Sequence, residues 1–496
     1  MTWADDWQRS SLTVVSWGKQ RQSGAMNRPV VTPRAGGLGG ALGLLVGALL
    51  TACPPPSTPS GGAADPGSTG LPPAATGSPA PAGSAQPVAS TALPGPPGSA
   101  DVTSGASVVT EGPGAAVITQ GKVDGAALRT RNVARLKQAK WPVAVLQGGS
   151  AEQLGRRLCE QVVPRRPAAT PVLIKPNICG FHALKKRSGP KDDDGMRGRI
   201  TDPEFVRGVV ACLKARGHKR ITIAEGCAVG HDMWARAMEV SGYRALAEQE
   251  GVPLVAMDDD GVFDVRGGKP GKPLRVTGMA DSHVPTFVMP KILAEHLQGG
   301  LFLSVPKIKA HRYAVVSVGI KGTQGVVMRS DRAPAHQQKW RMHAELHRYL
   351  ANKKRGQEDR AAFVQSLELF SDRVLDVLEV TLPDAILAEG APAMSGDGFD
   401  LLLPSSELYA VGGTNPVLVD KVAAELMGLW DNGALAAQLG GYRTSPLITI
   451  AAKRYGLDLK ATKVVGDGAP LLRQRRPARY RSMAGFAIGI DSSPSP

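Results

Sequence analysis

The sequence predicts an α/β domain in which a mainly parallel sheet is flanked by helices, a Rossmann-like three-layer arrangement. Short apolar runs alternate with amphipathic helical patterns after about residue 140, and the turns between them are short. The hydrophobic content of 42% is sufficient for a sizeable core. No strict Gly-X-Y period and no recurrent long apolar run appears, which excludes collagen and a polytopic membrane protein.

The first strand and helix of the pattern are clearly marked. Residues 172–174 read as a short buried strand. The segment Thr201-Asp202-Pro203-Glu204 opens a helix, because a capping side chain precedes a proline and a glutamate of the first turn. This helix ends at Gly217 and presents one apolar face, formed by Phe205, Val206, Val209, Val210 and Leu213.

The alternation continues along the chain. Residues 221–224 form the next strand, residues 243–250 a helix that ends at a glycine, and residues 253–257 another strand. Residues 301–305 predict a further strand, and residues 314–320 fit either a strand or a helix.

Two helical regions are predicted in the last third of the chain. We expect a mostly helical insertion near residues 333–375 that covers a cleft, and a helix over residues 417–427. The α/β domain as a whole is predicted to span residues 121–470. Residues 471–496 are basic and show no clear element, so they predict a flexible tail.

Residues 1–53 predict a start extension followed by a lipoprotein signal peptide. A short basic region follows Met26, and a small, apolar run from residue 35 to residue 50 leads to Leu-Thr-Ala-Cys at Cys53. This end resembles the bacterial lipobox, which implies cleavage before Cys53 and lipidation there. Pro54 follows the cysteine, and by resemblance to enterobacterial sorting this favours the outer membrane, facing the periplasm or the cell surface.

Residues 54–120 predict a disordered linker rich in Pro, Gly, Ala and Ser. The chain contains 39 prolines, and 13 of them lie between Pro54 and Pro97. Such a segment cannot bury enough apolar area to offset the entropy of ordering it.

The net charge of +16 belongs to the part that is predicted to fold. Residues 121–496 hold 54 bases and 38 acids, while the linker holds three acids and no base. A basic domain favours anionic partners such as phosphate esters, carboxylates or lipid headgroups. Export and the lack of a nucleic-acid-binding motif argue against nucleic acid.

Four cysteines remain besides Cys53, and export favours disulfides between them. Cys179 and Cys227 follow two strands and should share one edge of the sheet, whereas Cys159 and Cys212 fall on flanking helical segments. We therefore predict the pairs Cys179–Cys227 and Cys159–Cys212. A metal role for the first pair is the alternative. No Cys-x-x-Cys exists, so a ferredoxin-type cluster has no support and the cofactor stays open.

The segment Lys307-Ile308-Lys309-Ala310-His311 follows a predicted buried strand, and Lys321 comes ten residues later. Ligands of parallel sheets bind at the carboxyl ends of the strands. Several amines and an imidazole at this edge suit a carboxylate or a phosphate. The competing interpretation is an exposed basic loop.

His343 and His347 lie four residues apart, a spacing that would place both on one helix face and makes them weak candidates for metal ligands. The segment is not His-Glu-x-x-His, because Ala344 holds the second position. A solvated helix face explains it equally well. The predicted domain has no Walker, dinucleotide-binding or serine-hydrolase motif.

Residues 172 to about 430 resemble the domain-of-unknown-function 362 family. The resemblance rests on short segments in a common order: Ile174-Lys175-Pro176-Asn177, Thr201-Asp202-Pro203-Glu204, Ala224-Glu225-Gly226, Val305 to His311, Gly319-Ile320-Lys321-Gly322, Glu389-Gly390, Met394 to Gly398, and Thr414 to Asp420 with Met427-Gly428. Many members carry an iron–sulfur domain whose cysteines this chain lacks. Asn415 and Ser395 stand where the family usually has Asp and Glu.

The resemblance strengthens the hypothesis that these segments form a site for a small anionic ligand, which the protein binds and transforms. The predicted ligand-binding residues are Lys175, Asn177, Lys307, Lys309, Lys321 and Asp397. His311 is the predicted general acid or base, and Glu225 or Asp202 would orient it or a lysine. The alternatives are a binding protein without chemistry, an envelope-interaction protein and a metalloenzyme that uses His343 and His347.

Overall fold

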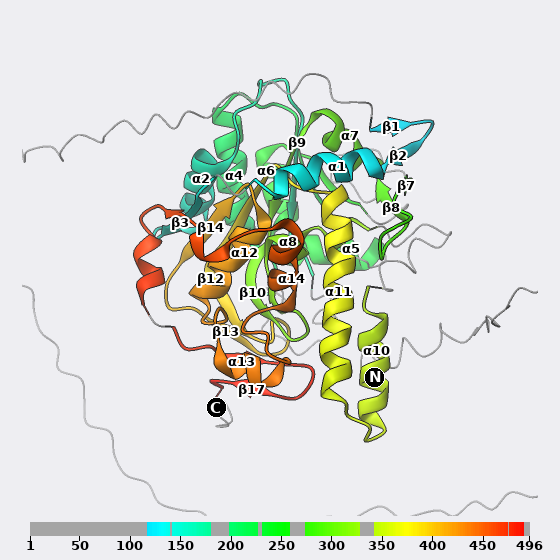
Figure 1. Cartoon of the computed structure of the whole chain (residues 1–496). Helices are drawn as coiled ribbons and strands as arrows, with labels where there is room; N and C mark the ends of the chain where they lie inside the picture. Colours follow the sequence, from blue (N-terminus) through cyan, green and yellow to red (C-terminus); the bar gives the residue numbers. More distant parts are fainter. Residues whose placement is uncertain are drawn as a thin grey trace, which may run out of the picture. The chain divides into compact units, whose positions relative to one another are not determined.

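The computed structural model describes the chain over seven ranges (Figure 1): 117–138, 141–179, 198–226, 231–257, 273–327, 342–474 and 476–490. The predicted signal peptide and linker, including Cys53, lie outside these ranges. None of the helices in the described part is long and apolar enough to cross a membrane.

A mixed sheet of 13 strands forms the centre of the fold, which confirms the predicted α/β class. Its main path runs in the order β15-β3-β14-β12-β9-β4-β5-β6, and β10, β11, β13, β16 and β17 join at the side. Neighbours from β12 to β6 are parallel, while β14 is antiparallel to both β12 and β3. The strands are β3 (Val143–Gln147), β4 (Val172–Pro176), β5 (Ile221–Glu225), β6 (Leu254–Ala256), β9 (Leu301–Val305), β10 (Lys307–His311), β11 (Val315–Ser317), β12 (Ala385–Gly396), β13 (Leu402–Pro404), β14 (Tyr409–Gly413), β15 (Val464–Val465), β16 (Tyr480–Arg481) and β17 (Ala487–Ile488).

Helices cover both faces of this sheet, because alternate residues of each strand pack into two separate cores. Ile174 and Leu303 belong to one core, whereas their neighbours Leu173 and Phe302 belong to the other. The first core includes α2 (Ala151–Val162), α4 (Pro203–Ala215), α5 (His231–Val240) and α6 (Tyr243–Glu250). The second includes α1 (Gly125–Leu136), α7 (Lys291–Gly299), α10 (Ala344–Lys354), α11 (Arg360–Val380), α12 (Pro416–Leu426), α13 (Gly433–Gln438) and α14 (Pro446–Tyr455).

Helix α4 begins where the sequence predicts it. Asp202 is the N-cap, its carboxylate accepts a hydrogen bond from the backbone N–H of Glu204, and Pro203 occupies the first turn. The predicted strands at 172–174, 221–224 and 301–305 and the helix at 243–250 are all present. The ambiguous segment 314–320 contains both kinds of structure, since β11 is followed by the short helix α8 (Gly319–Gly322).

Helices α2 and α4 pack unusually closely on one face. A Cβ at Gly155 would lie 2.1 Å from the carbonyl oxygen of Phe205, and one at Gly208 would lie 1.9 Å from that of Glu152. A disulfide joins Cys159 to Cys212 across the same contact, with a Cα–Cα distance of 6.2 Å. This pair confirms one of the two predicted disulfides.

Two other predictions concern the chain after residue 330. Helices α10 and α11 lie side by side within the described part of the predicted helical insertion (Figure 1). The tail from residue 471, which the sequence predicts to be flexible, instead contributes a strand to the sheet. Tyr480 pairs with β12 and is fully buried. The sequence pattern missed this segment because β16 and β17 have only two residues each.

A separate four-stranded sheet lies outside the central one, in the order β1-β2-β7-β8. Its strands are β1 (Ile118–Thr119), β2 (Lys122–Asp124), β7 (Pro273–Thr277) and β8 (Phe287–Pro290). Asp124 ends β2 and caps α1 by accepting a hydrogen bond from the N–H of Ala127. This sheet holds none of the predicted site residues.

Candidate functional site

The predicted site residues gather at the carboxyl ends of β4, β5 and β9. Lys175 is the penultimate residue of β4 and Glu225 is the last of β5, and β10 follows β9 after a single residue. Helix α8 and the 3-10 turn η1 (Gln324–Val326) lie against the same edge, since a Cβ at Gly325 would be 2.6 Å from Oε1 of Glu225 and 3.2 Å from Nζ of Lys175. This is the position at which open α/β sheets bind ligands.

Lys175 forms a buried ion pair with Glu225. Its Nζ lies 2.6 Å from Oε1 of Glu225, and only 2% of either side chain is exposed. The carboxylate also accepts hydrogen bonds from the N–H groups of Ile178 and Gly226. Burial raises the pKa of Glu225, and the adjacent Lys175 ammonium opposes this effect. The positive charge of Lys175 is therefore compensated within the protein.

Lys307 is compensated in the same way by Glu389. The two residues are register partners in the parallel pair of β10 and β12, and Nζ of Lys307 lies 2.8 Å from the carboxylate of Glu389. The N–H groups of Asp202 and Ala391 donate to the same carboxylate. Sequence reasoning did not assign this role to Glu389, because the acid lies 82 residues away from its lysine.

Lys309 has a different environment. Its side chain is 1% exposed, yet Nζ donates to the carbonyl oxygen of Arg199 at 2.6 Å and to Sγ of Cys179 at 3.0 Å. Its Nζ also lies 5.1 Å from the ring centroid of Phe399. Among the residues described, no carboxylate forms an ion pair with Lys309.

His311 is held by the turn of its own hairpin. Its Nδ1 accepts hydrogen bonds from the N–H groups of Tyr313 at 3.2 Å and Ala314 at 3.1 Å. This arrangement assigns the proton of the neutral ring to Nε2. Burial, together with the charges of Lys321 and Lys309, lowers the pKa of His311 well below its usual value. At neutral pH the residue is an Nε2–H donor, which does not suit the predicted role as a general base.

The hairpin that holds His311 contains an unusual backbone conformation. Val315, the register partner of His311, has a φ of 66°. A β-branched side chain rarely occupies this region, because its Cβ crowds the backbone. The surrounding structure keeps this hairpin in a strained shape that brings Nδ1 of His311 back over the turn.

Lys321 lies on helix α8 and is partly exposed. The pKa of Lys321 is lowered to about 8, mainly by burial; the charges of Lys309 and Lys175 act in the same direction, while Cys179 and Glu225 oppose the shift. Over the described ranges, Lys321 makes no ion pair with a carboxylate. Its ammonium is thus charged at neutral pH and can lose a proton slightly above it.

Asp420 fixes the turn that carries Lys321. Its carboxyl group, on α12, accepts hydrogen bonds from the N–H of Gly319 at 2.6 Å and of Ile320 at 3.2 Å. Burial raises the pKa of Asp420 to about 8, and these backbone hydrogen bonds oppose the shift. The segment from Thr414 to Asp420 therefore has a structural role at this edge of the sheet.

Asp397 organises the loop that follows it. Its Oδ1 accepts hydrogen bonds from the N–H groups of Phe399, Asp400 and Leu401, and Oδ2 accepts one from Arg481. Burial acts to raise the pKa of Asp397, but these hydrogen bonds outweigh it and hold the pKa below its usual value. Both carboxylate oxygens therefore accept hydrogen bonds from the protein, and the predicted ligand contact of Asp397 stays a prediction.

The loop after Asp397 presses Phe399 onto the lysine and the histidine of β10. The Phe399 and His311 ring centroids lie 5.3 Å apart. Gly398 permits this approach, because a Cβ there would lie 2.0 Å from the carbonyl oxygen of Ala310, and its φ is 78°. Sequence reasoning missed Phe399, although Gly398, at the end of a segment that resembles the family pattern, could have indicated a close backbone contact.

Asn177 and Asp202 connect the strand ends to α4. The N–H of Asn177 donates to Oγ1 of Thr201, whose hydroxyl donates to the carbonyl oxygen of Val305. Asp202 caps α4, and its side chain contacts neither His311 nor a lysine in the hydrogen bonds of the described residues. Its predicted orienting role is therefore not supported, whereas Glu225 does contact Lys175.

Cys179 carries a free thiol, which contradicts the predicted Cys179–Cys227 disulfide. Its Sγ is directed to Nζ of Lys309 and lies 3.7 Å from Oδ1 of Asn177 and 3.6 Å from the carbonyl oxygen of Arg199. Cys227 lies outside the described residues. Cys179 follows β4, as the sequence predicts. The contact of its sulfur with Lys309 was not predicted, because it depends on the position of β10.

His343 and His347 stand next to this site rather than within it. Their ring centroids are 6.3 Å apart, and Nε2 of His343 lies 3.4 Å from Nε2 of Gln324. Burial and the charge of Lys321 lower the pKa of His343 to about 3. Within the described ranges, no group of three or more His, Cys, Asp or Glu side chains could hold a metal ion.

Two polar hydroxyls near α8 have no hydrogen-bond partner among the described residues: Ser304 Oγ and Thr323 Oγ1, on residues that are 1% and 0% exposed. A Cβ at Gly322 would lie 2.7 Å from Oγ of Ser304, so this hydroxyl faces the turn that carries Lys321. Buried hydroxyls normally have a partner, which makes them candidate contacts for a ligand or a water molecule.

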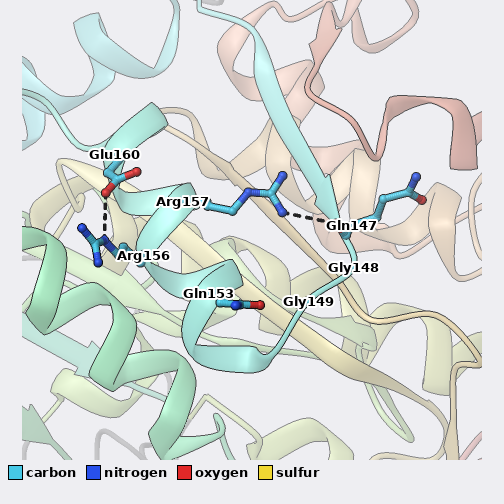
Figure 2. A pocket seen from close by; sticks show the side chains of 7 residues that line it. All are labelled: Gln147, Gly148, Gly149, Gln153, Arg156, Arg157 and Glu160. Atoms are coloured by element: carbon cyan, nitrogen blue, oxygen red, sulfur yellow. Dashed lines mark hydrogen bonds and ion pairs between the residues drawn. The ribbon is translucent and has the colours of Figure 1, made fainter. Parts of the chain in front are cut away.

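A surface pocket of about 570 Å³ lies elsewhere, at the start of α2 (Figure 2). It is lined by Gln147, Gly148, Gly149, Gln153, Arg156, Arg157 and Glu160. Arg156 pairs with Glu160, and Arg157 pairs with Asp467 and donates to the carbonyl oxygen of Gln147. Its two arginines are therefore already compensated, and none of the predicted site residues lines it.

Residues 172–425, about half of the chain, match the family described as Domain of unknown function (DUF362), and the chain belongs to this family. No curated protein and no solved structure matches the chain. The matched range includes Lys175, Glu225, Lys309, Lys321 and Glu389 and ends within α12. Asn415, one of the two departures, caps α12 through its side-chain oxygen, and Ser395 is a register partner of Leu403 in β13.

Proposed function

We propose that this DUF362 protein binds a small oxyanion, a carboxylate or a phosphate, between Lys309 and Lys321. The observation that supports this most is the uneven compensation of the four lysines. Lys175 and Lys307 are each neutralised by a buried glutamate, while Lys309 and Lys321 have no ion-pair partner in the part that the structure describes.

An anionic ligand would lower the unfavourable free energy of placing Lys309 and Lys321 here without carboxylate partners. Buried charges are normally paired, because an uncompensated charge in a low-dielectric site is unfavourable. The charges of Lys309 and Lys321 both lower the pKa of His311, so the two lysines lie in one positively charged region. An oxyanion bound there takes the place that glutamates hold beside Lys175 and Lys307.

Neutral donors next to the two lysines would complete the site. The Nε2–H of His311 lies on the same strand as Lys309, two residues away, and both contact Phe399. The hydroxyls of Ser304 and Thr323 lie beside Lys321 in sequence or in space. His311 therefore acts in this proposal as a hydrogen-bond donor and not as a base.

Titration calorimetry with inorganic phosphate and with succinate tests the proposal on the full chain. Charge-assisted hydrogen bonds contribute about 1.5–3 kcal/mol each, so Lys309→Met and Lys321→Met should each weaken binding by about tenfold or more. Lys291→Met is the matched control, because Lys291 is half exposed on α7 and pairs with Glu295. Unchanged affinity in both site variants, or no binding to the wild type, would overturn the proposal.

We propose in addition that Cys53 anchors the chain to a membrane through a lipid. The support is the basic, apolar and small-residue pattern that ends at this cysteine. Labelling of cells with a radioactive fatty acid should mark the wild-type chain and not the Cys53→Ser variant. Equal labelling of the two chains would contradict the lipid anchor.

A further inference from the structure

Cys179, within the described residues, is a nucleophilic side chain that the anion site leaves unexplained. It follows β4 directly, it is partly exposed, and its sulfur accepts a hydrogen bond from Nζ of Lys309 at 3.0 Å. The Lys309 ammonium is almost completely buried and lacks a carboxylate partner in the described ranges. A thiol beside such a cation is in the environment that reactive cysteines share.

We propose that Cys179 is a nucleophile that accepts the acyl group of a small, negatively charged acyl phosphate, ester or thioester. This inference rests on the proposed oxyanion site, because Lys309 and Lys321 would hold the negative group of the substrate next to the sulfur. Charge interaction between Lys321 and Cys179 shows that the second lysine also lies near the thiol.

The neighbouring groups match the needs of acyl transfer. Attack on a carbonyl carbon creates negative charge on its oxygen, and preorganised N–H donors stabilise that charge. The Nε2–H of His311 is such a donor, since backbone N–H groups occupy Nδ1 and fix the tautomer. The partner-free hydroxyl of Ser304, which faces the turn of Lys321, is a second independent sign that a polar group belongs here.

The reaction is balanced with water as the second substrate. The Cys179 thiolate forms a bond to the acyl carbon, the bond from that carbon to the leaving oxygen or sulfur breaks, and the Lys321 ammonium supplies a proton to the leaving group. Water then attacks the thioester carbon, the carbon–sulfur bond breaks, and Lys321 regains a proton from the water. The products are a free acid and the leaving phosphate, alcohol or thiol.

Charge-selective alkylation provides the first test on the full chain. The wild type is treated with iodoacetate, which is anionic, or with iodoacetamide, which is neutral, and peptide mass spectrometry quantifies modification at Cys179. We expect iodoacetate to react at least fivefold faster than iodoacetamide at Cys179, and Lys309→Met to abolish this preference. Faster reaction with iodoacetamide in the wild type, or an unreactive Cys179, would overturn the inference.

Acyl transfer is tested with acetyl phosphate. The wild type should gain one acetyl group at Cys179, and the release of phosphate should exceed the spontaneous rate. Cys179→Ser should lose the adduct and this excess release, and a wild-type thermal unfolding temperature should show that the variant is folded. If the wild type binds phosphate but forms no adduct, Cys179 is not a nucleophile and the proposed function is unaffected. If the wild type does not bind phosphate, or if the lysine variants bind it equally well, the proposed function itself is wrong.

Discussion

Two pairs of lysines lie at the same edge of the sheet and have opposite surroundings. Lys175 and Lys307 are fully buried against Glu225 and Glu389, whereas Lys309 meets a sulfur and a carbonyl oxygen. Lys321 is partly exposed and has no carboxylate partner in the described ranges. The number of basic residues is therefore a poor guide to an anion site. Which charges lack a partner within the protein is more informative.

The largest effect should follow from breaking a compensated pair. Glu389→Leu leaves Lys307 buried without a counter-charge and removes the acceptor of two backbone N–H groups. We expect a loss of about 3–5 kcal/mol in the free energy of unfolding, measured by guanidinium denaturation. The double variant Lys307→Met/Glu389→Leu should recover most of it. A loss below about 1 kcal/mol in Glu389→Leu would show that the pair is not structurally coupled.

A second effect should appear on acidification. His311 and His343 both have pKa values far below the value of about 6.5 in an unfolded chain, through burial and the nearby charge of Lys321. Below pH 6.5 the unfolded chain therefore takes up protons that the folded chain does not, and stability falls. The slope is up to about 1.4 kcal/mol per pH unit for each histidine.

Denaturation curves between pH 7 and pH 5 measure this slope. His343→Asn should reduce it, because the variant removes one of the two groups and leaves His311 in place. An unchanged slope would mean that His343 is not held neutral in the folded protein.

Alkaline pH should weaken anion binding through the titration of Lys321. Lys321 has a pKa of about 8 and binds an oxyanion best when protonated, so the affinity for succinate, whose own charge is constant above pH 7, should fall as the pH rises through 8. Calorimetry at pH 7 and pH 9 should give about a tenfold weaker affinity at the higher pH, in line with the loss of one charge-assisted hydrogen bond. In Lys321→Met the same change of pH should have little effect.

Lys309→Met should affect binding and stability with opposite signs. Removal of a buried charge that lacks a counter-ion should raise the free energy of unfolding by about 1 kcal/mol, while phosphate binding weakens by about tenfold or more. Lys291→Met, at a half-exposed ion pair, should change stability by less than about 0.5 kcal/mol. A destabilised Lys309→Met would indicate that the contacts with Arg199 and Cys179 already satisfy the ammonium.

The smallest effect concerns the departure at Asn415. Asn415→Asp keeps the oxygen that caps α12 but replaces the Nδ2 donor to the carbonyl oxygen of Leu136. We expect a loss of about 1 kcal/mol in stability and no change in phosphate affinity. A changed affinity would show that this position acts on the site through α12 and Asp420.

Local patterns were sufficient to predict a large part of the fold. The strands at 172–174 and 301–305 and the cap of α4 at Asp202 depend on neighbouring residues, so they are legible in the sequence. The 12-residue β12 was not predicted, because Glu389, Gly390 and Pro392 interrupt its apolar pattern. The pairing of Lys307 with Glu389 depends on the register of β10 and β12, which no local pattern contains.

The difference between local patterns and distant contacts also explains which features of the site residues were predicted. Lys175, Lys309 and His311 were placed at the correct edge, because each follows or forms a strand end. The contacts of Asp397 and Cys179 were not predicted, since they depend on donors from distant segments, namely Arg481 for Asp397 and Lys309 for Cys179.

The Cys159–Cys212 disulfide has a consequence for the integrity of the chain. The two cysteines are 53 residues apart, and the covalent ring they close contains Lys175, Asn177 and Cys179 together with the start of α4. A protease that cuts once anywhere inside this ring leaves two fragments that remain joined through sulfur. Such a nicked protein would migrate as one species until a reductant is added, and only then would it separate into its two pieces.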